Sequence, residues 1–262
     1  MEELGYSALS MNLGFLGTGH ISSSIIEGIF KSKLKFKKIY LSPRNKILAK
    51  KLNKRFKKVV ICKNNQQLIN ISNWVFLAIT PKVGNKILKD LKFKKDKKII
   101  SFISTISLEK LKKITKNKKV TRVIPLPFIG MRKGPIIICP EDKMLKTFFS
   151  NLGEVITLKS EKISKSFWAT SSFMASFYNL MNETSNWLNS KGIKRKNAEN
   201  YTRSLFLALA QDAVNKNKIS LKQLVLESQT PGGTNAFVLK QLKKKKFYKV
   251  QQKVLNSIFK KF

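Results

Sequence analysis

The chain has 262 residues, which allow one large domain or two smaller ones, and its 42% hydrophobic and 10% aromatic content excludes a disordered protein. Its formal net charge is +39, because 53 Lys and Arg stand against 14 Asp and Glu. Only six of the 53 are arginine and the lysines are scattered along the whole chain, whereas base-reading proteins depend on bidentate arginine and concentrate their charge. We therefore interpret the charge as solvated lysine faces, which adhere to nucleic acid without specificity at low salt and attract anionic cofactors.

Cysteine and histidine are too few for a disulfide framework or a metal cluster, since the chain has only Cys62, Cys139 and His20. No apolar run approaches the ~20 residues that span a bilayer. The first ten residues are partly acidic and lack the pattern of a signal peptide. We expect a cytoplasmic protein with no membrane partner and no metal, in which residues 1–10 form a disordered extension.

Residues 11–22 have the pattern of a strand, a glycine turn and a helix. An apolar run ends at Gly17-Thr18-Gly19, and apolar residues then recur at helical spacing from Ile21 onward. Glycines in such a turn let the backbone approach a pyrophosphate, whose charge the helix N-terminus stabilises. However, the third small position of the G-x-G-x-x-G motif is Ser22, and a glycine turn also arises for geometry alone. His20 lies in this turn, where its ring N–H would touch a cofactor or stay exposed without a function.

A second apolar run, over residues 38–41, ends at Ser42-Pro43-Arg44-Asn45, roughly 20 residues after the glycines. NAD-binding units place an Asp or Glu there to bind the ribose 2′-hydroxyl. Here Ser42, Arg44 and Asn45 offer hydrogen-bond donors instead, and a guanidinium suits a 2′-phosphate. The sequence therefore predicts NADP(H) as the preferred cofactor and NAD(H) as a second choice. The alternative is that this segment is only a polar turn.

The next apolar runs indicate strands buried on both faces of a parallel sheet, with helices such as residues 108–115 between them. This alternation predicts a doubly wound α/β domain, a Rossmann-type domain over residues 11–159. The runs cover residues 74–79, 99–103, 120–124, 136–139 and, as a last strand, 153–158.

From residue 160 onward the pattern is helical, which predicts an all-α domain over residues 160–262. Residues 166–187 form the longest predicted helix, and its aromatic side chains indicate core and subunit contact. Predicted helices over 198–214 and 221–226 follow, and Lys243–Lys246 fits a helix C-terminus. Two glycines and a hydroxyl in Thr230–Asn235 precede a helix, where free backbone N–H groups favour a carboxylate. The alternative there is a simple turn with an N-cap.

Five motifs in chain order resemble those of the pyrroline-5-carboxylate reductase family. They are G-F-L-G-T-G at 14–19, S-P-R-N at 42–45, V-F-L-A-I-T-P at 75–81, R-V-I-P at 122–125 and T-P-G-G-T at 230–234. The resemblance extends over residues 11–262 and implies a Rossmann domain followed by a helical domain that interlocks two subunits around a shared active site. It implies reduction of 1-pyrroline-5-carboxylate to L-proline with NAD(P)H, the last step of proline biosynthesis. Hydride transfer to a protonated imine requires positioning and exclusion of water, not a nucleophile or a metal.

The resemblance also implies roles for particular residues. The pyrophosphate would meet Gly17, Thr18, Gly19, His20 and Ile21, the adenosine side Ser42, Arg44 and Asn65, and the nicotinamide path Ala78, Ile79, Thr80, Pro81, Phe102, Ile103 and Ser104. The imine acid would meet Gly232, Gly233, Thr234 and Asn235, of which Thr234 and Asn235 would be catalytic.

Four departures from the family pattern affect the substrate more than the cofactor. Asn235 replaces the usual threonine, residues 171–177 replace the motif S-G-S-G-P-A-Y, residues 126–128 lack an asparagine and a threonine, and Thr80 replaces a lysine. A reductase of another cyclic imine or small carbonyl acid is therefore an alternative. A non-catalytic NADP-binding protein and a basic nucleic-acid-binding protein are alternatives from other classes.

Overall fold

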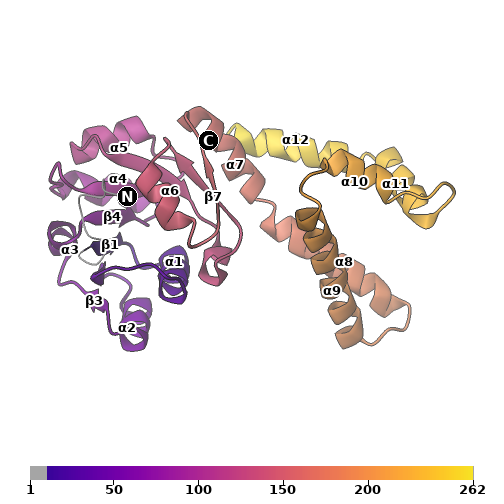
Figure 1. Ribbon diagram of the computed structural model, residues 1–262, viewed down its shortest axis with the longest axis horizontal. Coiled ribbons are helices and arrows are strands. Elements are labelled where there is room, and N and C mark those ends of the chain that lie inside the picture. The colour runs from indigo at the N-terminus through magenta and orange to yellow at the C-terminus, as the bar shows by residue number, and fades with distance from the viewer. Residues whose placement is uncertain (1–10, 262) are drawn as a thin grey trace. The chain divides into compact units, whose positions relative to one another are not determined.

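The computed structural model describes residues 11–261, so the extension expected over residues 1–10 lies outside the described part. The chain divides into two compact units, an α/β unit that runs to Trp168 and a helical unit over Ala169–Lys261 (Figure 1). The predicted fold class is thereby confirmed. In the described residues, no helix is long and apolar enough to cross a membrane.

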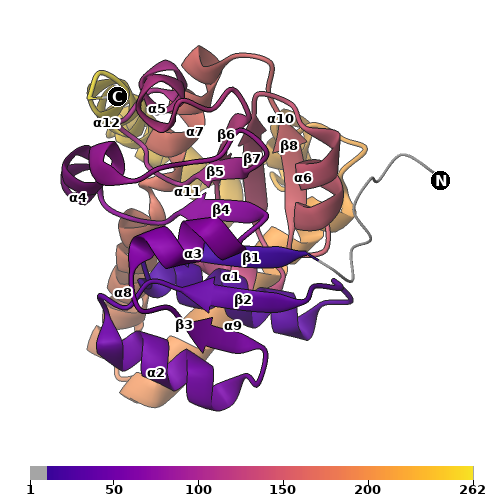
Figure 2. The same cartoon turned by 90° about the vertical axis from the view of Figure 1, so that its left-hand side faces the viewer.

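One sheet forms the centre of the α/β unit, and its eight strands over residues 12–157 lie in the order β3-β2-β1-β4-β5-β6-β7-β8 (Figure 2). Strands β1 to β6 are parallel, and β1 lies between β2 and β4. The strands are β1 (Asn12–Leu16), β2 (Lys38–Leu41), β3 (Val59–Ile61), β4 (Trp74–Leu77), β5 (Lys98–Ser101), β6 (Val120–Ile124), β7 (Pro135–Cys139) and β8 (Glu154–Thr157).

Strand β7 corrects the prediction that the whole sheet is parallel. It pairs with β6 in the antiparallel sense, with Arg122 opposite Cys139, and β8 is parallel to β7. The connection from β6 to β7 is residues 125–134, which include only the short 3-10 helix η3 (Pro127–Met131). A parallel neighbour requires a crossover of a dozen or more residues. The connection is therefore too short for a parallel β7.

Helices cover both faces of the sheet, and alternate residues of a strand pack into two different cores. Phe76 of β4 packs in the core beneath α1, α2 and α6, whereas Val75 and Leu77 pack in the core beneath α3, α4 and α5. This is why strand β4 is apolar at every position. The helices are α1 (His20–Lys31), α2 (Lys46–Arg55), α3 (Asn65–Ile71), α4 (Pro81–Ile87) with the 3-10 turn η2 (Leu88–Asp90), α5 (Leu108–Thr115) and α6 (Lys143–Phe149).

The helical segment differs from the predicted single helix over residues 166–187. Helix α7 (Glu161–Ser171) ends where the Ser172 and Phe173 N–H groups donate to Ala169 and Thr170 in tight i→i−3 bonds. Helix α8 (Met174–Ser190) begins after this break, and the longest helix is α9 (Arg195–Asn215). Helices α10 (Leu221–Glu227), α11 (Thr234–Lys244) and α12 (Phe247–Phe259) follow, so the lysine run does end a helix.

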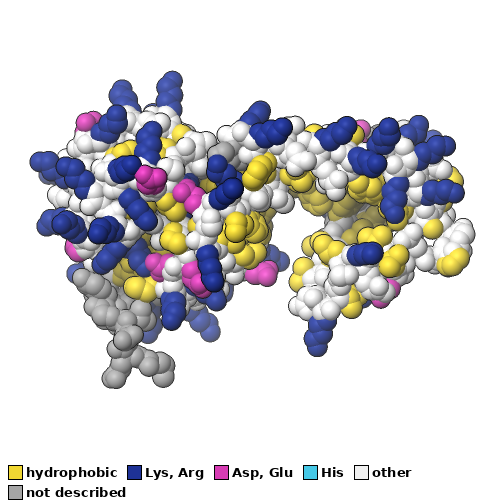
Figure 3. All heavy atoms as spheres, turned by 90° about the horizontal axis from the view of Figure 1, so that it is seen from above, with side chains coloured by type: hydrophobic (Ala, Val, Ile, Leu, Met, Phe, Trp, Pro, Cys, Tyr) yellow, Lys and Arg dark blue, Asp and Glu magenta, His cyan; other side chains and the backbone are white. Residues whose placement is uncertain are grey.

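The helices of the second unit leave large apolar side chains open to solvent (Figure 3). Helices α10, α11 and α12 contain no buried residue among those described. Amphipathic helices of this kind require a covering surface. The exposed side chains include Tyr178, Trp187, Leu207, Leu209, Leu221, Phe237 and Val250.

Candidate functional site

The turn between β1 and α1 uses its two glycines differently. Gly17 has φ +105°, which L side chains rarely adopt, and a Cβ there would lie 2.3 Å from the carbonyl oxygen of Ala78. Gly19 is the N-cap of α1, and a Cβ there would meet no described atom within 4 Å. The first glycine therefore makes the turn, and the second leaves room for a ligand at the helix N-terminus.

Two buried serines support this turn from behind. The Ser42 hydroxyl accepts the Gly17 N–H at 3.0 Å, and the Ser42 carbonyl accepts the Thr18 hydroxyl at 3.1 Å. The Ser22 hydroxyl donates to the Gly17 carbonyl at 2.7 Å, so the serine at the third motif position ties the turn to α1. Ser42 is only 2% exposed and lies behind the turn, not in the pocket in front of it.

A pocket of about 630 Å³ opens in front of the turn, beyond the carboxyl ends of β1, β2 and β4. The strand order reverses at β1 and β4, and open α/β sheets bind ligands at such a point. Seven residues predicted for the cofactor line this pocket together with three that the sequence analysis missed. The seven are Thr18, Gly19, Arg44, Asn45, Ala78, Ile79 and Thr80, and the three are Lys46, Ile47 and Val83.

The pocket has a basic edge and an apolar wall. Arg44 and Lys46 are exposed at the start of α2, where the Asn45 side chain accepts the Leu48 N–H at 3.2 Å and caps the helix. Ile47 is 81% exposed, an unusual state for an isoleucine at the edge of a pocket. Phosphate groups suit the basic edge, and a flat ring suits the apolar side chains.

Only weak sequence patterns pointed to the three pocket residues that the sequence analysis missed. Lys46 is one of many lysines, and its position directly after the polar turn was the only sign. Ile47 is an apolar residue away from the buried face of α2, which consists of Ala49 and Leu52. Val83 lies in the first turn of α4, so the apolar run before Pro81 did not include it.

The remaining predicted cofactor residues lie around the pocket without lining it. His20 is exposed and lines a separate hollow between α1 and α2, beside an ion pair of Glu27 and Arg55 at 2.8 Å. Ile21 packs against the core, and Pro81 is the first residue of α4. Asn65 begins α3, and its buried Oδ1 atom has no hydrogen-bond partner within residues 11–261.

Ile103 and Ser104 lie in the loop that follows β5, and β5 is the strand that pairs with β4. The Phe102 N–H at the start of this loop donates to Leu77, the last residue of β4, at 3.1 Å. The Arg122 guanidinium, beneath the loop, donates to the Ile103 carbonyl. Burial lowers the pKa of Arg122, and the carboxylate of Glu161 opposes that shift.

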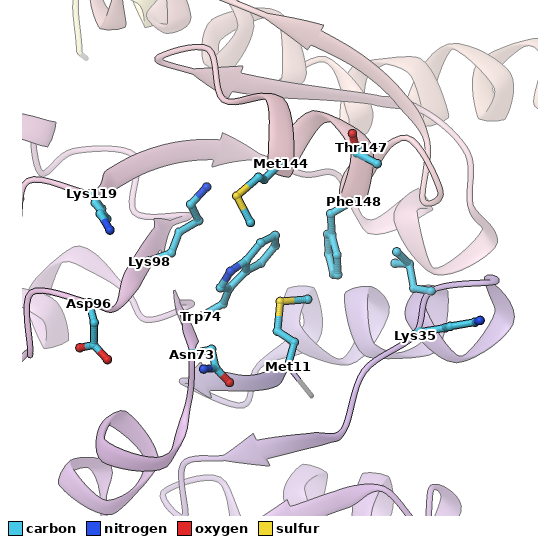
Figure 4. Close-up of a pocket in the computed structure, with 11 residues that line it drawn as sticks. Met11, Lys35, Asn73, Trp74, Asp96, Lys98, Lys119, Met144, Thr147 and Phe148 are labelled. Carbon is cyan, nitrogen blue, oxygen red and sulfur yellow. The ribbon is translucent and has the colours of Figure 1, made fainter. Parts of the chain in front are cut away.

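A second hollow, of about 250 Å³, lies at the opposite edge of the sheet, where β1, β4 and β5 begin (Figure 4). Trp74 and Phe148 form much of its apolar wall, and Lys98 lies 5.5 Å from the Trp74 ring centroid while it pairs with Asp142 at 2.6 Å. None of the predicted site residues lines this hollow. An apolar wall is therefore not enough to distinguish the pocket at the carboxyl ends of the strands from other hollows.

The turn over residues 230–235 leads into helix α11 in the helical unit. Gly232 has φ +73°, and Gly233 is the N-cap of α11, with its N–H donating to the Thr230 carbonyl at 2.8 Å. The Asn235 amide nitrogen donates to the Ser228 carbonyl at 3.1 Å. Because a carbonyl can only accept, the Asn235 amide is oriented with its oxygen available as an acceptor. Thr234 begins the helix and is exposed beside it.

The strand order, the glycine turn and the basic edge of the pocket are those of a dinucleotide-binding α/β domain. Residues 12–105 match the family model described as NADP oxidoreductase coenzyme F420-dependent, and residues 161–262 match that of pyrroline-5-carboxylate reductase dimerisation. The chain belongs to the pyrroline-5-carboxylate reductase family, as its motifs predicted. Its dimerisation segment indicates a homo-oligomer.

Solved structures of this family share the fold over nearly the whole chain. The 1-pyrroline-5-carboxylate reductase of Streptococcus pyogenes has 21% identity and a TM-score of 0.82, covering 96% of this chain and 98% of that one. The Plasmodium falciparum pyrroline carboxylate reductase, with NADP bound, has 19% identity and a TM-score of 0.82 over 97% and 98%. The Coxiella burnetii enzyme has 20% identity and a TM-score of 0.77 over 97% of each chain. No match was found among curated proteins.

Proposed function

We propose that this protein reduces 1-pyrroline-5-carboxylate to L-proline with NADPH. One observation carries the proposal: the pocket in front of the glycine turn has a basic edge, and in the helical unit of the same chain α11 begins at a glycine N-cap beside Asn235, whose amide nitrogen donates to the Ser228 carbonyl. The solved relatives that cover nearly the whole chain are pyrroline carboxylate reductases, and one of them holds NADP.

The preference for NADPH follows from the charges at the pocket. Arg44 and Lys46 lie where a ribose 2′-phosphate would sit, beyond the end of β2, and no acidic side chain of residues 11–261 lines the pocket. A carboxylate there would bind a 2′-hydroxyl but repel a 2′-phosphate. Asn65 follows the neighbouring strand β3, on the side where the resemblance implies the adenosine.

The imine acid would be held by the turn at the start of α11. Backbone N–H groups of Thr234 and Asn235 would bind its carboxylate, and Asn235 Oδ1 would accept the N–H of the protonated ring nitrogen. When bound, NADPH would supply the hydride that adds to the carbon of the protonated imine, whose C=N double bond becomes the C–N single bond of the amine. The chain's own residues orient the two reactants and exclude water.

We further propose that the functional form is a homodimer built from the helical unit. The exposed apolar side chains of α8 to α12 provide the surface, and the family resemblance implies an active site shared across it. Light scattering during gel filtration should give twice the 30.0 kDa mass of one chain, or a multiple of that value. A stable monomer with full activity would reject this part of the proposal.

The decisive experiment follows NADPH oxidation at 340 nm with racemic 1-pyrroline-5-carboxylate, and compares 1-pyrroline-2-carboxylate and NADH. Turnover confined to the 5-carboxylate and NADPH supports the proposal. NADPH binding with turnover of another imine or carbonyl acid would favour a related reductase, for which the amide at Asn235 is the supporting observation. NADPH binding without turnover of any of these compounds would favour a non-catalytic protein. Absence of turnover together with sequence-dependent nucleic-acid binding that survives physiological ionic strength, about 150 mM salt, would favour a nucleic-acid-binding protein.

Two variants locate the substrate site. Asn235→Ala should lower kcat by about 10²-fold, because the ring nitrogen loses its acceptor, and should leave the NADPH dissociation constant unchanged. Asn235→Thr, which restores the usual family residue, should retain turnover. An Asn235→Ala enzyme with normal kcat would show that the imine binds elsewhere.

A further inference from the structure

Arg122 is a buried cation in the α/β unit. It lies in the middle of β6 with only 1% of its surface exposed and is the largest side chain among the fully buried ones described. In a chain with a net charge of +39, most cations are solvated, so the burial of this one requires an explanation. Buried charges persist where they are paired and hydrogen-bonded. The two terminal nitrogens of Arg122 make such bonds, whereas its Nε atom has no partner within residues 11–261.

The partners of Arg122 belong to one loop and one carboxylate. The guanidinium donates to the carbonyls of Ile103 and Ile106, the latter at 2.5 Å. It also donates to Glu161 Oε1 at 2.6 Å. The two carboxylate oxygens of Glu161 in turn accept the Leu108 N–H at the start of α5, at 3.1 and 3.0 Å. The pair therefore holds the β5–α5 loop at three backbone points.

This loop forms the backing of the cofactor pocket. A Cβ added to Gly84 of α4 would lie 3.2 Å from the side chains of both Ile103 and Ile106, and 3.7 Å from that of Ile79. Ile79 lines the pocket together with Val83 of the same helix. The side chains of the loop thus pack directly behind the pocket wall formed by the end of β4 and the start of α4.

The position of the loop in the sheet decides which part of a dinucleotide it would affect. In the order β3-β2-β1-β4-β5-β6, a dinucleotide bound across the point where the order reverses would place its adenosine over the β1 to β3 half and its nicotinamide over the β4 to β6 half. The loop follows β5 and therefore belongs to the nicotinamide half. Arg44 and Lys46, which follow β2, belong to the other half.

We propose that the Arg122–Glu161 pair is a positioning device for the nicotinamide half of the cofactor site. It rests on the proposed binding of NADP(H). Both residues act through the 103–108 loop and touch no reactant. Since an ion pair between a buried cation and a half-buried carboxylate contributes little net stability compared with apolar residues, its value lies in fixing three backbone groups of an irregular segment.

The test compares two ligands that share the adenosine half. Dissociation constants of NADPH and of 2′,5′-ADP, which lacks the nicotinamide, are measured by calorimetry for the wild-type protein and Glu161→Gln. The variant should weaken NADPH about tenfold, because the loop loses its ionic anchor, and should change 2′,5′-ADP less than about twofold. Arg122→Lys, which cannot reach two carbonyls and a carboxylate together, should show the same split.

Asp142→Asn is the matched control. Asp142 also pairs with a half-buried cation, Lys98, and also accepts a helix N-terminal N–H, that of Leu145 at 3.0 Å. It lies at the opposite edge of the sheet, so both ligands should bind this variant normally. Equal losses of both ligands in Glu161→Gln, or no loss of either, would overturn the positioning role. Failure of the wild-type protein to bind 2′,5′-ADP would instead reject the proposed cofactor site itself.

Discussion

Gly17 and Gly19 are two residues apart, but the structure assigns them different physical tasks. Gly17→Ala should lower the free energy of unfolding by at least about 2 kcal/mol, because a side chain at φ +105° is strained and its Cβ would meet the Ala78 carbonyl. Gly19→Ala should leave stability within about 1 kcal/mol, since its Cβ enters open space, but should weaken NADPH binding by occupying the approach of the pyrophosphate. Urea unfolding and calorimetry measure the two effects. If both variants lose stability equally, the division of tasks is wrong.

Cys62 makes the stability of the α/β unit depend on alkaline pH. Burial raises the pKa of its thiol from 9.0 to about 11. The unfolded thiol therefore ionises first as the pH rises, so the free energy of unfolding is highest below pH 9 and falls between pH 9 and 11 by at most about 1.4 kcal/mol per unit. Denaturant titrations at pH 8.5, 10 and 11 should show this fall in the wild-type protein.

The control is Cys62→Ala, in which this contribution is absent. Lysine deprotonation and the buried Cys139, whose pKa burial also raises, affect both proteins alike. The free energy of unfolding of the wild-type protein, minus that of Cys62→Ala, should therefore fall steadily above pH 9. A constant difference across this range would show that the thiol ionises equally in the folded and unfolded states.

For individual residues, the sequence predicted the backbone turn at the pocket better than the orientation of the side chains around it. The glycine turn and Arg44 follow from local patterns, because a tight turn and a missing acid are visible in the chain. The inward orientation of Ser42 was not predictable, since its partner Gly17 is 25 positions away in the sequence. The roles of Thr234 and Asn235 rest on the resemblance and stay predictions.

At the scale of elements, the cap of α2 links stability to cofactor binding. Asn45→Ala removes the acceptor for the Leu48 N–H and should lower the free energy of unfolding by about 1 kcal/mol. Ser220→Ala removes an equivalent cap from α10, where the Ser220 hydroxyl accepts the Gln223 N–H at 3.1 Å. Both should lose similar stability, but only Asn45→Ala should weaken NADPH binding, as thermal melts with and without NADPH would show. Unchanged NADPH affinity in Asn45→Ala would separate α2 from the cofactor.

Secondary-structure elements whose own residues show a complete periodic pattern were predicted well. The direction of a strand and a break between two helices were not, because they depend on the surrounding chain. The helix over 108–115 has the bounds of α5, and the run over 153–158 contains β8. The direction of β7 depends on the length of the preceding connection, which hydrophobic periodicity does not report. The break at Ser172 and Phe173 is equally hidden, because apolar residues continue at helical spacing on both sides.

At the scale of the whole molecule, the excess of lysine should make stability depend on salt. Lys and Arg side chains cover both units, with few acidic groups between them (Figure 3). Raising NaCl from 20 to 300 mM shortens the Debye length from about 20 Å to about 6 Å and screens this repulsion. The melting temperature should therefore rise by several degrees, on the order of 1 kcal/mol of stability. An equal rise with other monovalent salts would support screening, whereas a flat or falling melting temperature would contradict it.

During synthesis, the α/β unit leaves the ribosome before the helices do. It carries nearly all of the buried apolar side chains, because between residues 169 and 261 only Ala169 and Ala198 belong to that group. The first part of a nascent chain can therefore fold while the rest is being made, but the helices have little to fold around until another surface covers them. If that surface is a second copy of the chain, maturation ends with a bimolecular encounter. The rate of that encounter is lower when the cell holds fewer copies, so a scarce protein spends longer exposed to proteases and chaperones.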